Sequence, residues 1–303
     1  VRHMNTQTRG ILCALSGGIL WGYSGTIGQY LFANYEISSE WLTTARMICA
    51  GVILLAFGLL KHMPLKAVWT DRTAAFRLVL FAVIGLMTVQ LTYMKAIYYS
   101  NSATATALQY LGQALIMAVT CVQLMRLPTG REWMALVLAV GGVFLLSTRG
   151  NLHALALSPL ALLWGLGAAV SLMLYTMIPK ALIQKYGSIP ITGFGMLIGG
   201  IALCVLTKSW SFFPKMDTTG WIYVGIIILF GTAAAFTLYL QGVSDVGGVT
   251  ASLLACSEPV CATLITTVWL KTDLVFSDYI AFAMIIFMSV LLALPRRKNE
   301  HEE

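Results

Sequence analysis

Glu258 is the acidic residue that lies deepest within a long apolar segment of the sequence. A carboxylate at that depth costs at least about 2.5–3.5 kcal/mol on membrane-insertion scales, so it must face a partner or water. One interpretation is functional: a counter-charge for a cationic substrate, or a carboxyl group that takes up a proton. The other is structural: pairing with Arg46 or Lys95, or hydrogen bonds to backbone groups freed by Pro259. The sequence leaves both interpretations open.

Arg46 and Lys95 are the basic residues within apolar segments. Each lies a few residues from the predicted outer end of its segment, so each could extend its charge to the membrane surface. A side chain that points inward would instead bind a carboxylate or phosphate, which would favour an anionic or zwitterionic substrate.

Aromatic and amide side chains recur at helical spacing within the apolar segments. A chamber of Trp and Tyr with one carboxylate suits an organic cation, at about 0.5–2 kcal/mol per cation–π contact. It suits an aromatic amino acid by stacking equally well, and the alternative is an interfacial belt or lipid-facing packing. The candidate substrate-binding residues are Trp21, Gln90, Tyr93, Gln109, Tyr110, Gln113, Trp164, Tyr175, Tyr239 and Glu258.

The composition determines which elements position these residues. Of the 303 residues, 58% are hydrophobic and 10% are charged, and the mean hydropathy is +0.82. Apolar segments long enough to cross a hydrocarbon core about 30 Å thick occur at about 10–33, 40–60, 75–99, 103–125, 131–148, 158–184, 189–207, 219–242, 248–270 and 277–294. The sequence predicts an all-α membrane protein with ten transmembrane helices and no soluble catalytic domain.

The basic residues predict the orientation of the chain. The net charge is +7, but most Lys and Arg residues fall in the segments on the side of the two termini. The predicted outer segments contain only Arg149, Lys208, Lys215 and Lys271. This bias predicts that both termini are cytoplasmic. It explains the basicity without a nucleic-acid partner. We expect the protein to be integral to a bacterial inner membrane.

The sequence contains an internal repeat. A shift of 146 residues places Gly85 on Gly231 and Tyr93 on Tyr239 without a gap. A slightly different offset matches Leu20-Trp21-Gly22 with Leu163-Trp164-Gly165. We expect two five-helix repeats, residues 9–150 and 151–295. Because five is odd, the second repeat would be inverted in the membrane, and the two halves could rock around a site at mid-depth.

Motifs for other chemistry are absent from the sequence. The six cysteines lie in apolar segments without CxxC spacing, and no GxxxxGK[ST], GxSxG or HExxH motif occurs. We therefore expect no disulfide, metal, cofactor or enzymatic activity, and no drive by ATP. Transport would depend on gradients or be passive.

An ordered set of motifs resembles a known family: Trp21-Gly22-Tyr23-Ser24-Gly25, Arg46, the segment Thr106 to Tyr110, and Glu258-Pro259. Over about residues 9–295 the chain is similar to EamA-type members of the drug/metabolite transporter superfamily. The resemblance implies a central cavity lined chiefly by the first, third, fourth, sixth, eighth and ninth spans. The related four-span multidrug exporters carry a Glu in their first span. The first span here has none, so the resemblance does not imply proton antiport by that route.

These observations predict a secondary transporter that moves a small organic metabolite by alternating access. An amino acid or related compound is the first expectation, with a choline-like or other organic cation as the alternative. The partners expected are a small-molecule substrate and the lipid bilayer, with proton coupling and the direction of transport left open. A membrane scaffold or lipid-modifying enzyme is the remote alternative, since it would need reactive residues at one membrane face.

Overall fold

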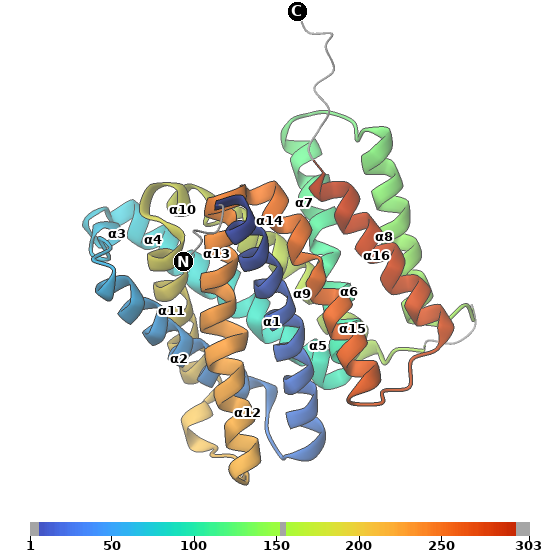
Figure 1. The fold of residues 1–303 in the computed structure, drawn as a ribbon, viewed down its shortest axis with the longest axis horizontal. Coiled ribbons are helices and arrows are strands. Elements are labelled where there is room, and N and C mark those ends of the chain that lie inside the picture. The colour runs from blue at the N-terminus through green and yellow to red at the C-terminus, as the bar shows by residue number, and fades with distance from the viewer. Residues whose placement is uncertain (1–5, 152–155, 295–303) are drawn as a thin grey trace, which may run out of the picture.

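The computed structural model describes residues 6–151 and 156–294, which form a bundle of ten helices long and apolar enough to span a membrane (Figure 1). The first five spans contain α1 (Thr6–Asn34), α2 (Ser39–Leu60), α4 (Arg72–Leu80) continued by η1 (Phe81–Met87) and α5 (Thr88–Tyr99), α6 (Ser102–Tyr110) continued by α7 (Gly112–Gln123), and α8 (Gly130–Thr148). The short helix α3 (Ala67–Thr70) lies between the second and third spans.

The next five spans repeat this pattern. They contain α9 (Pro159–Met177), α11 (Ser188–Thr207), α12 (Thr218–Ile228) continued by η3 (Leu229–Ala234) and α13 (Ala235–Val246), α14 (Gly248–Ala255) continued by α15 (Ser257–Val268), and α16 (Phe276–Ala293). The connecting helices are α10 (Lys180–Tyr186) and η2 (Ser209–Ser211). No strand occurs in either described range. Residue 295 of the predicted second repeat and the basic residues Arg296, Arg297 and Lys298 lie outside the described residues.

The ten predicted spans are confirmed, with one substantial correction at the sixth. The sequence predicts a helix over 158–184, but α9 ends at Met177 and α10 is separate. Pro179 explains the difference, because its ring nitrogen carries no proton for the helix ladder.

Helix irregularities occur at matching places in the two halves. The π-helical turns η1 and η3 interrupt the third and eighth spans and contain Gly85 and Gly231, the pair matched in the sequence repeat. The fourth span breaks at Leu111 and the ninth at Cys256. Their recurrence agrees with the sequence repeat, and π-turns often occur at functional sites.

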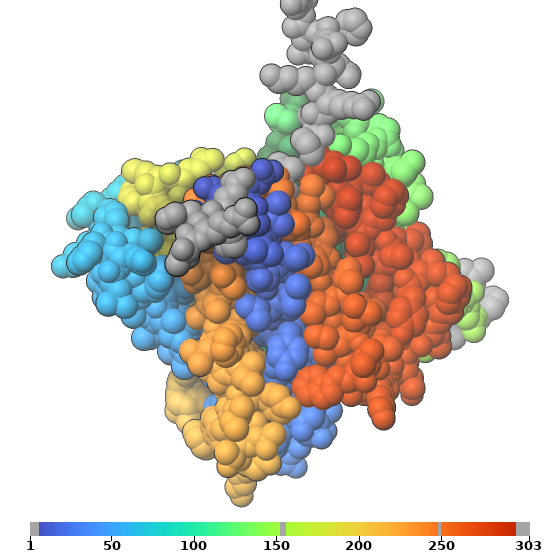
Figure 2. Space-filling view, viewed as in Figure 1, coloured from blue at the N-terminus to red at the C-terminus, as the bar shows by residue number. Residues whose placement is uncertain are grey.

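Helices of the first half pack mainly against helices of the second. The principal pairs are α2 with α11, α8 with α16, α1 with α13, and α5 with α9. If the two halves are exchanged, this set of pairs stays the same. The pair of the first and eighth spans (α1 with α13) becomes the pair of the sixth and third spans (α9 with α5), and each of the other two pairs becomes itself. Helices α2 and α11 form one edge of the bundle and α8 and α16 the other (Figure 1), while α1 lies between α13 and α14–α15 (Figures 1 and 2).

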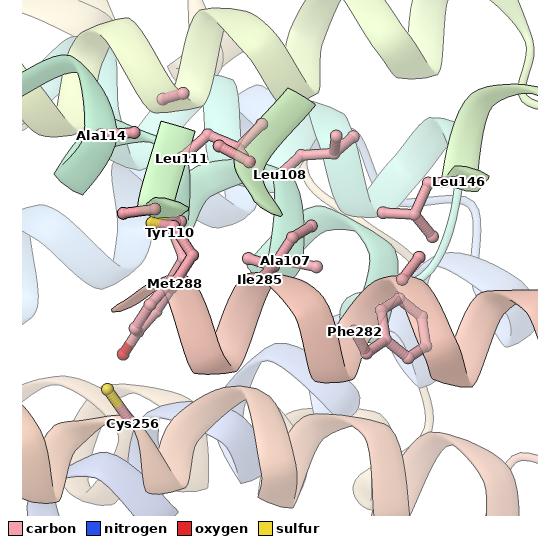
Figure 3. Close-up of a cluster of buried hydrophobic side chains, with 14 of the residues drawn as sticks. Ala107, Leu108, Tyr110, Leu111, Ala114, Leu146, Cys256, Phe282, Ile285 and Met288 are labelled. Carbon is pink, nitrogen blue, oxygen red and sulfur yellow. The ribbon is translucent and has the colours of Figure 1, made fainter. Parts of the chain in front are cut away.

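The interior is built from close helix contacts. Between α6 and α16, Leu108, Phe282 and Ile285 pack in one buried cluster, and the hydroxyl end of Tyr110 points towards the helix that carries Cys256 (Figure 3). Gly22 allows α1 to approach α15, because a Cβ atom there would lie 2.5 Å from the carbonyl oxygen of Glu258. Such small residues are what bring membrane helices into contact.

Candidate functional site

A cavity of about 680 Å³ lies between the two halves. This volume is typical of small-molecule sites. Its wall includes each predicted site residue except Trp164. The six spans expected from the family resemblance contribute to the wall, and residues of the second, fifth and tenth spans join them, among them Arg46, Glu132 and Leu292.

The cavity opens on one side of the membrane. Leu124, Arg126, Arg131, Thr176 and Leu294 line its mouth, close to the ends of α7, α9 and α16 and the start of α8. Leu124 and Leu294 are 61% and 41% exposed. The mouth therefore lies on the side where α1 begins and α16 ends.

Contacts from α1, and from Tyr35 directly after it, close the opposite side. The Gln29 amide accepts a hydrogen bond from the Ser102 backbone N–H at 2.8 Å and donates one to Thr272 Oγ1 at 3.0 Å. The Tyr30 ring stacks on Trp269 with centroids 5.3 Å apart, and the Tyr35 hydroxyl donates to Asp217 Oδ1 at 2.6 Å. The cavity ends before these residues, so its two ends differ in access.

Tyr110 joins the halves at mid-depth. Its hydroxyl lies 2.9 Å from the carbonyl oxygen of Ala255 and 3.0 Å from Oε2 of Glu258. The Ala255 carbonyl is the one that the N–H of residue 259 would normally bind, and Pro259 has no N–H. Tyr110 thus supplies the hydrogen bond that Pro259 cannot, beside the buried carboxylate.

Glu258 and Arg46 are buried charges without an ionic partner. Glu258 is 8% exposed and Arg46 is 4% exposed. Among the described residues, the ion pairs within 4.0 Å include neither of them. The expected ion pair of Glu258 with Arg46 or Lys95 therefore does not form within 4.0 Å: Lys95 pairs with Glu40, and Arg46 and Glu258 line the same cavity and act on each other only at longer range.

Arg46 points inward, which is the second of the two orientations that the sequence allowed. Its Nε and Nη1 atoms are buried and have no hydrogen-bond partner. Lys95 takes the first orientation, since it pairs with Glu40 in the first turn of α2 at the closed side, with Nζ 5.5 Å from the centre of the Trp164 ring.

Aromatic rings form one wall of the cavity. Trp21 contacts Phe236 and Tyr239, with ring centroids 5.1 and 5.0 Å apart. Tyr175 stacks on Phe81 at 5.8 Å. The Tyr93 hydroxyl shares a 2.9 Å hydrogen bond with Thr106 Oγ1, so its position is fixed by a neighbouring span.

Trp164 lies outside the cavity. Its half-buried ring packs in the cluster that includes Ile27 and Ile97, beneath Lys95. Trp164 precedes Tyr175 by eleven residues on α9, a separation of about 16 Å at 1.5 Å per residue, which places it towards the closed side. Helical spacing identified the correct face of α9 but not how far along the helix the cavity extends.

Other lining residues were outside the predicted set. Ser24 and Phe236 belong to faces that the helical spacing picks out, so the signal for them was present. Arg126, Arg131 and Glu132 lie in or beside a loop, and no spacing or motif in the sequence indicates that they line the cavity. Arg126 forms a two-point ion pair with Glu132 at 2.8 Å, and this hydrogen bonding raises the pKa of Arg126. The described residues contain no group of His, Cys, Asp and Glu suited to a metal ion.

Comparisons with known proteins agree with this architecture. The profile of the EamA-like transporter family matches residues 8–148 and 159–294. The uncharacterized inner membrane transporter YicL of Salmonella typhimurium is 33% identical over 302 residues, which cover 98% of this chain and 99% of YicL. The uncharacterized transporter YwfM of Bacillus subtilis is 27% identical, with 96% of each chain covered. A solved crystal structure, 18% identical, superposes with a TM-score of 0.63 over 93% of this chain and 95% of its own, which shows the shared fold.

Proposed function

The chain belongs to the EamA-like transporter family and is an integral inner-membrane transporter, and from this premise we propose that it moves a small organic metabolite by alternating access. The observation that carries the proposal is the cavity between the halves, which is open at one end and closed at the other. A site of this kind needs only a change of the closed end to release its contents on the other side.

The packing of the helices supports a rocking motion of two inverted repeats, residues 9–150 and 151–295. Because the helix pairs are unchanged when the halves are exchanged, a second arrangement with the open and closed ends reversed would use equivalent contacts. In that arrangement, the helix ends of both halves that now line the mouth would close. The contacts of Gln29 and Tyr35 would separate.

The substrate that we propose is an amino acid or a related compound. Glu258 would bind its ammonium group, while Trp21, Tyr93, Tyr175 and Tyr239 would contact its apolar part. Gln90, Gln109, Tyr110 and Gln113 add hydrogen-bonding groups to the same wall. Polar groups that converge in an aromatic cavity are typical of sites that orient a small amphipathic ligand.

A choline-like organic cation is the second candidate. The contact of Trp21 with Tyr239 beside Glu258 favours it, since aromatic faces and one carboxylate attract a quaternary ammonium group. Proton coupling through Glu258 belongs to the same proposal. The Tyr110 hydroxyl can donate its one hydrogen bond to the Ala255 carbonyl or to an ionised Glu258. The charge of Glu258 would therefore alter the hydrogen bond to the carbonyl at the helix break.

Transport by the purified protein in proteoliposomes tests the proposal. Compounds that raise the melting temperature of the detergent-solubilised protein are chosen from amino acids, amines and quaternary ammonium salts, because a ligand that binds the folded state stabilises it. We expect uptake of a stabilising compound against empty-vesicle controls, and counterflow when the vesicles are preloaded with the unlabelled compound. If every stabilising compound stays outside the vesicles, the transport proposal is wrong. Comparing a pH jump with a substrate gradient alone then tests proton coupling.

A further inference from the structure

Arg46 is a buried cation that faces the cavity without an ion-pair partner within 4.0 Å among the described residues, although Glu258 acts on it at longer range. Its side chain lines the cavity, the residue is 4% exposed, and Nε and Nη1 lack a hydrogen-bond acceptor. Buried arginines are normally paired with carboxylates or phosphates, which their planar donors match in geometry. Glu132, the other acid at the cavity besides Glu258, is already paired with Arg126.

Ser24 is a second unpartnered donor in the same wall. It is 3% exposed and its hydroxyl has no hydrogen-bond partner. The hydroxyl lies against Gly231, where a Cβ atom would approach Ser24 Oγ to 2.2 Å. Ser24 lies on α1 and Arg46 on α2, and both helices pack against η3. Two unpartnered, buried donors in this part of the wall match the needs of an oxyanion, which accepts several hydrogen bonds at once.

The geometry points to an anion-binding subsite formed by Arg46 and Ser24, which holds a carboxylate or another oxyanion group of the substrate. This inference rests on the proposed function and deepens it. Helix α2 starts and helix α15 ends at the closed side of the cavity. At 1.5 Å per residue, Arg46 lies about 10 Å from that end of α2, and Glu258 lies about 15 Å from that end of α15. A substrate with both charges could therefore bind with its anionic group deeper than its ammonium group. A choline-like cation would leave Arg46 without a partner.

Probes that share one phenyl group separate the charge requirements. L-phenylalanine carries both charges, phenethylamine and phenylalanine methyl ester carry only the cation, and 3-phenylpropionate carries only the anion. Melting temperatures of the full-length protein are titrated with these four probes and with the remaining standard amino acids. We expect at least one amino acid to bind, and its matched amine and ester to bind at least tenfold more weakly.

Variants assign the carboxylate to the subsite. Arg46→Gln should weaken binding of the amino acid at least tenfold and change binding of the matched amine less than threefold, and Arg46→Lys should recover part of the loss. Ser24→Ala should weaken binding of the amino acid about threefold to tenfold. It is a smaller change, which keeps the test available if Arg46→Gln fails to fold. Lys95→Gln is the matched control, since Lys95 pairs with Glu40 outside the cavity, and should change binding less than twofold.

Several results would overturn the subsite. The first is that no amino acid raises the melting temperature of the wild-type protein. The second is that the amine or ester binds as tightly as the matched amino acid. The third is that Arg46→Gln or Ser24→Ala leaves the preference for the amino acid over the amine unchanged. Flux of an amine into proteoliposomes would then leave the transport proposal intact, so the two failures are distinguishable.

Discussion

The Tyr110 hydroxyl lies 3.0 Å from Oε2 of Glu258, although the two residues are 148 positions apart and belong to different halves of the chain. The same hydroxyl reaches the Ala255 carbonyl at 2.9 Å. It has one proton to donate, so the carboxylate and the carbonyl compete for it. The carboxylate of Glu258 and the helix break of the ninth span therefore share one hydrogen-bond donor.

Glu258→Gln should reduce the initial rate of transport at least tenfold while the protein stays folded. The amide keeps the size of the side chain and can still accept from Tyr110, but it removes the negative charge from the cavity. Initial rates in proteoliposomes and melting temperatures measure the two effects. Glu40→Gln is the control, because Glu40 pairs with Lys95 outside the cavity. Wild-type rates for Glu258→Gln would assign the residue to structure alone.

Tyr110→Phe should lower the free energy of unfolding by about 1–3 kcal/mol, because the buried Ala255 carbonyl loses its hydrogen-bond donor. Pro259→Ala restores an N–H that can bond to this carbonyl. The loss caused by Tyr110→Phe should therefore be smaller in the Pro259→Ala background. Denaturation of the four proteins of this double-mutant cycle measures the coupling between the residues. Strictly additive effects would show that Tyr110 does not compensate for Pro259.

The sequence predicted the spans well because apolar length is a strong constraint in a membrane. Helical spacing also predicted part of the cavity wall, including Trp21, Tyr93 and Tyr239, since polar and aromatic residues share a face there. Depth was harder to predict. Trp164 shares the face of α9 that carries Tyr175 but lies beyond the cavity. The orientation of Arg46 depends on the packing of α2 against its neighbours, which local spacing does not encode.

Trp21→Ala should weaken substrate binding about tenfold, whereas Trp164→Ala should leave the affinity unchanged. Trp21 contacts Tyr239 and Phe236 in the cavity wall, while Trp164 packs beneath Lys95. Both substitutions remove a large ring and cost packing energy, so melting temperatures without ligand should fall in each. Binding isotherms of a stabilising ligand separate the two variants. An equal loss of affinity in both would extend the site beyond the cavity.

Gly231→Ala should destabilise the protein by about 1–3 kcal/mol, because overpacking strains a filled interface. The new Cβ atom would lie 2.2 Å from both Cβ and Oγ of Ser24. Gly225→Ala, one turn and a half away, is the matched control, since a Cβ atom there meets nothing within 4 Å. The control should be neutral or slightly stabilising. Equal melting temperatures for the two variants would contradict the close contact of η3 with α1.

The Tyr35–Asp217 hydrogen bond at the closed side should contribute equally across the neutral pH range. It holds the pKa of Asp217 below its usual range and raises the pKa of Tyr35 to about 12. Both residues lie outside the spans. The stabilisation linked to Asp217 is present above the ordinary aspartate pKa of about 3.9 and is lost as the pH falls through the lowered value. The stabilisation linked to Tyr35 is present below the ordinary tyrosine pKa of about 10 and is lost only as the pH rises through the raised value.

Tyr35→Phe should therefore lower the melting temperature, and alter the transport rate, by the same amount at pH 5, 7 and 9. Tyr99→Phe removes a hydroxyl from a ring that contacts Tyr98 at the same end of the bundle, and should have no effect on either quantity. A Tyr35→Phe effect that disappears between pH 5 and pH 9 would mean that another titrating group controls this closure. A constant effect would show that the Tyr35–Asp217 hydrogen bond is not the source of any dependence of transport on pH.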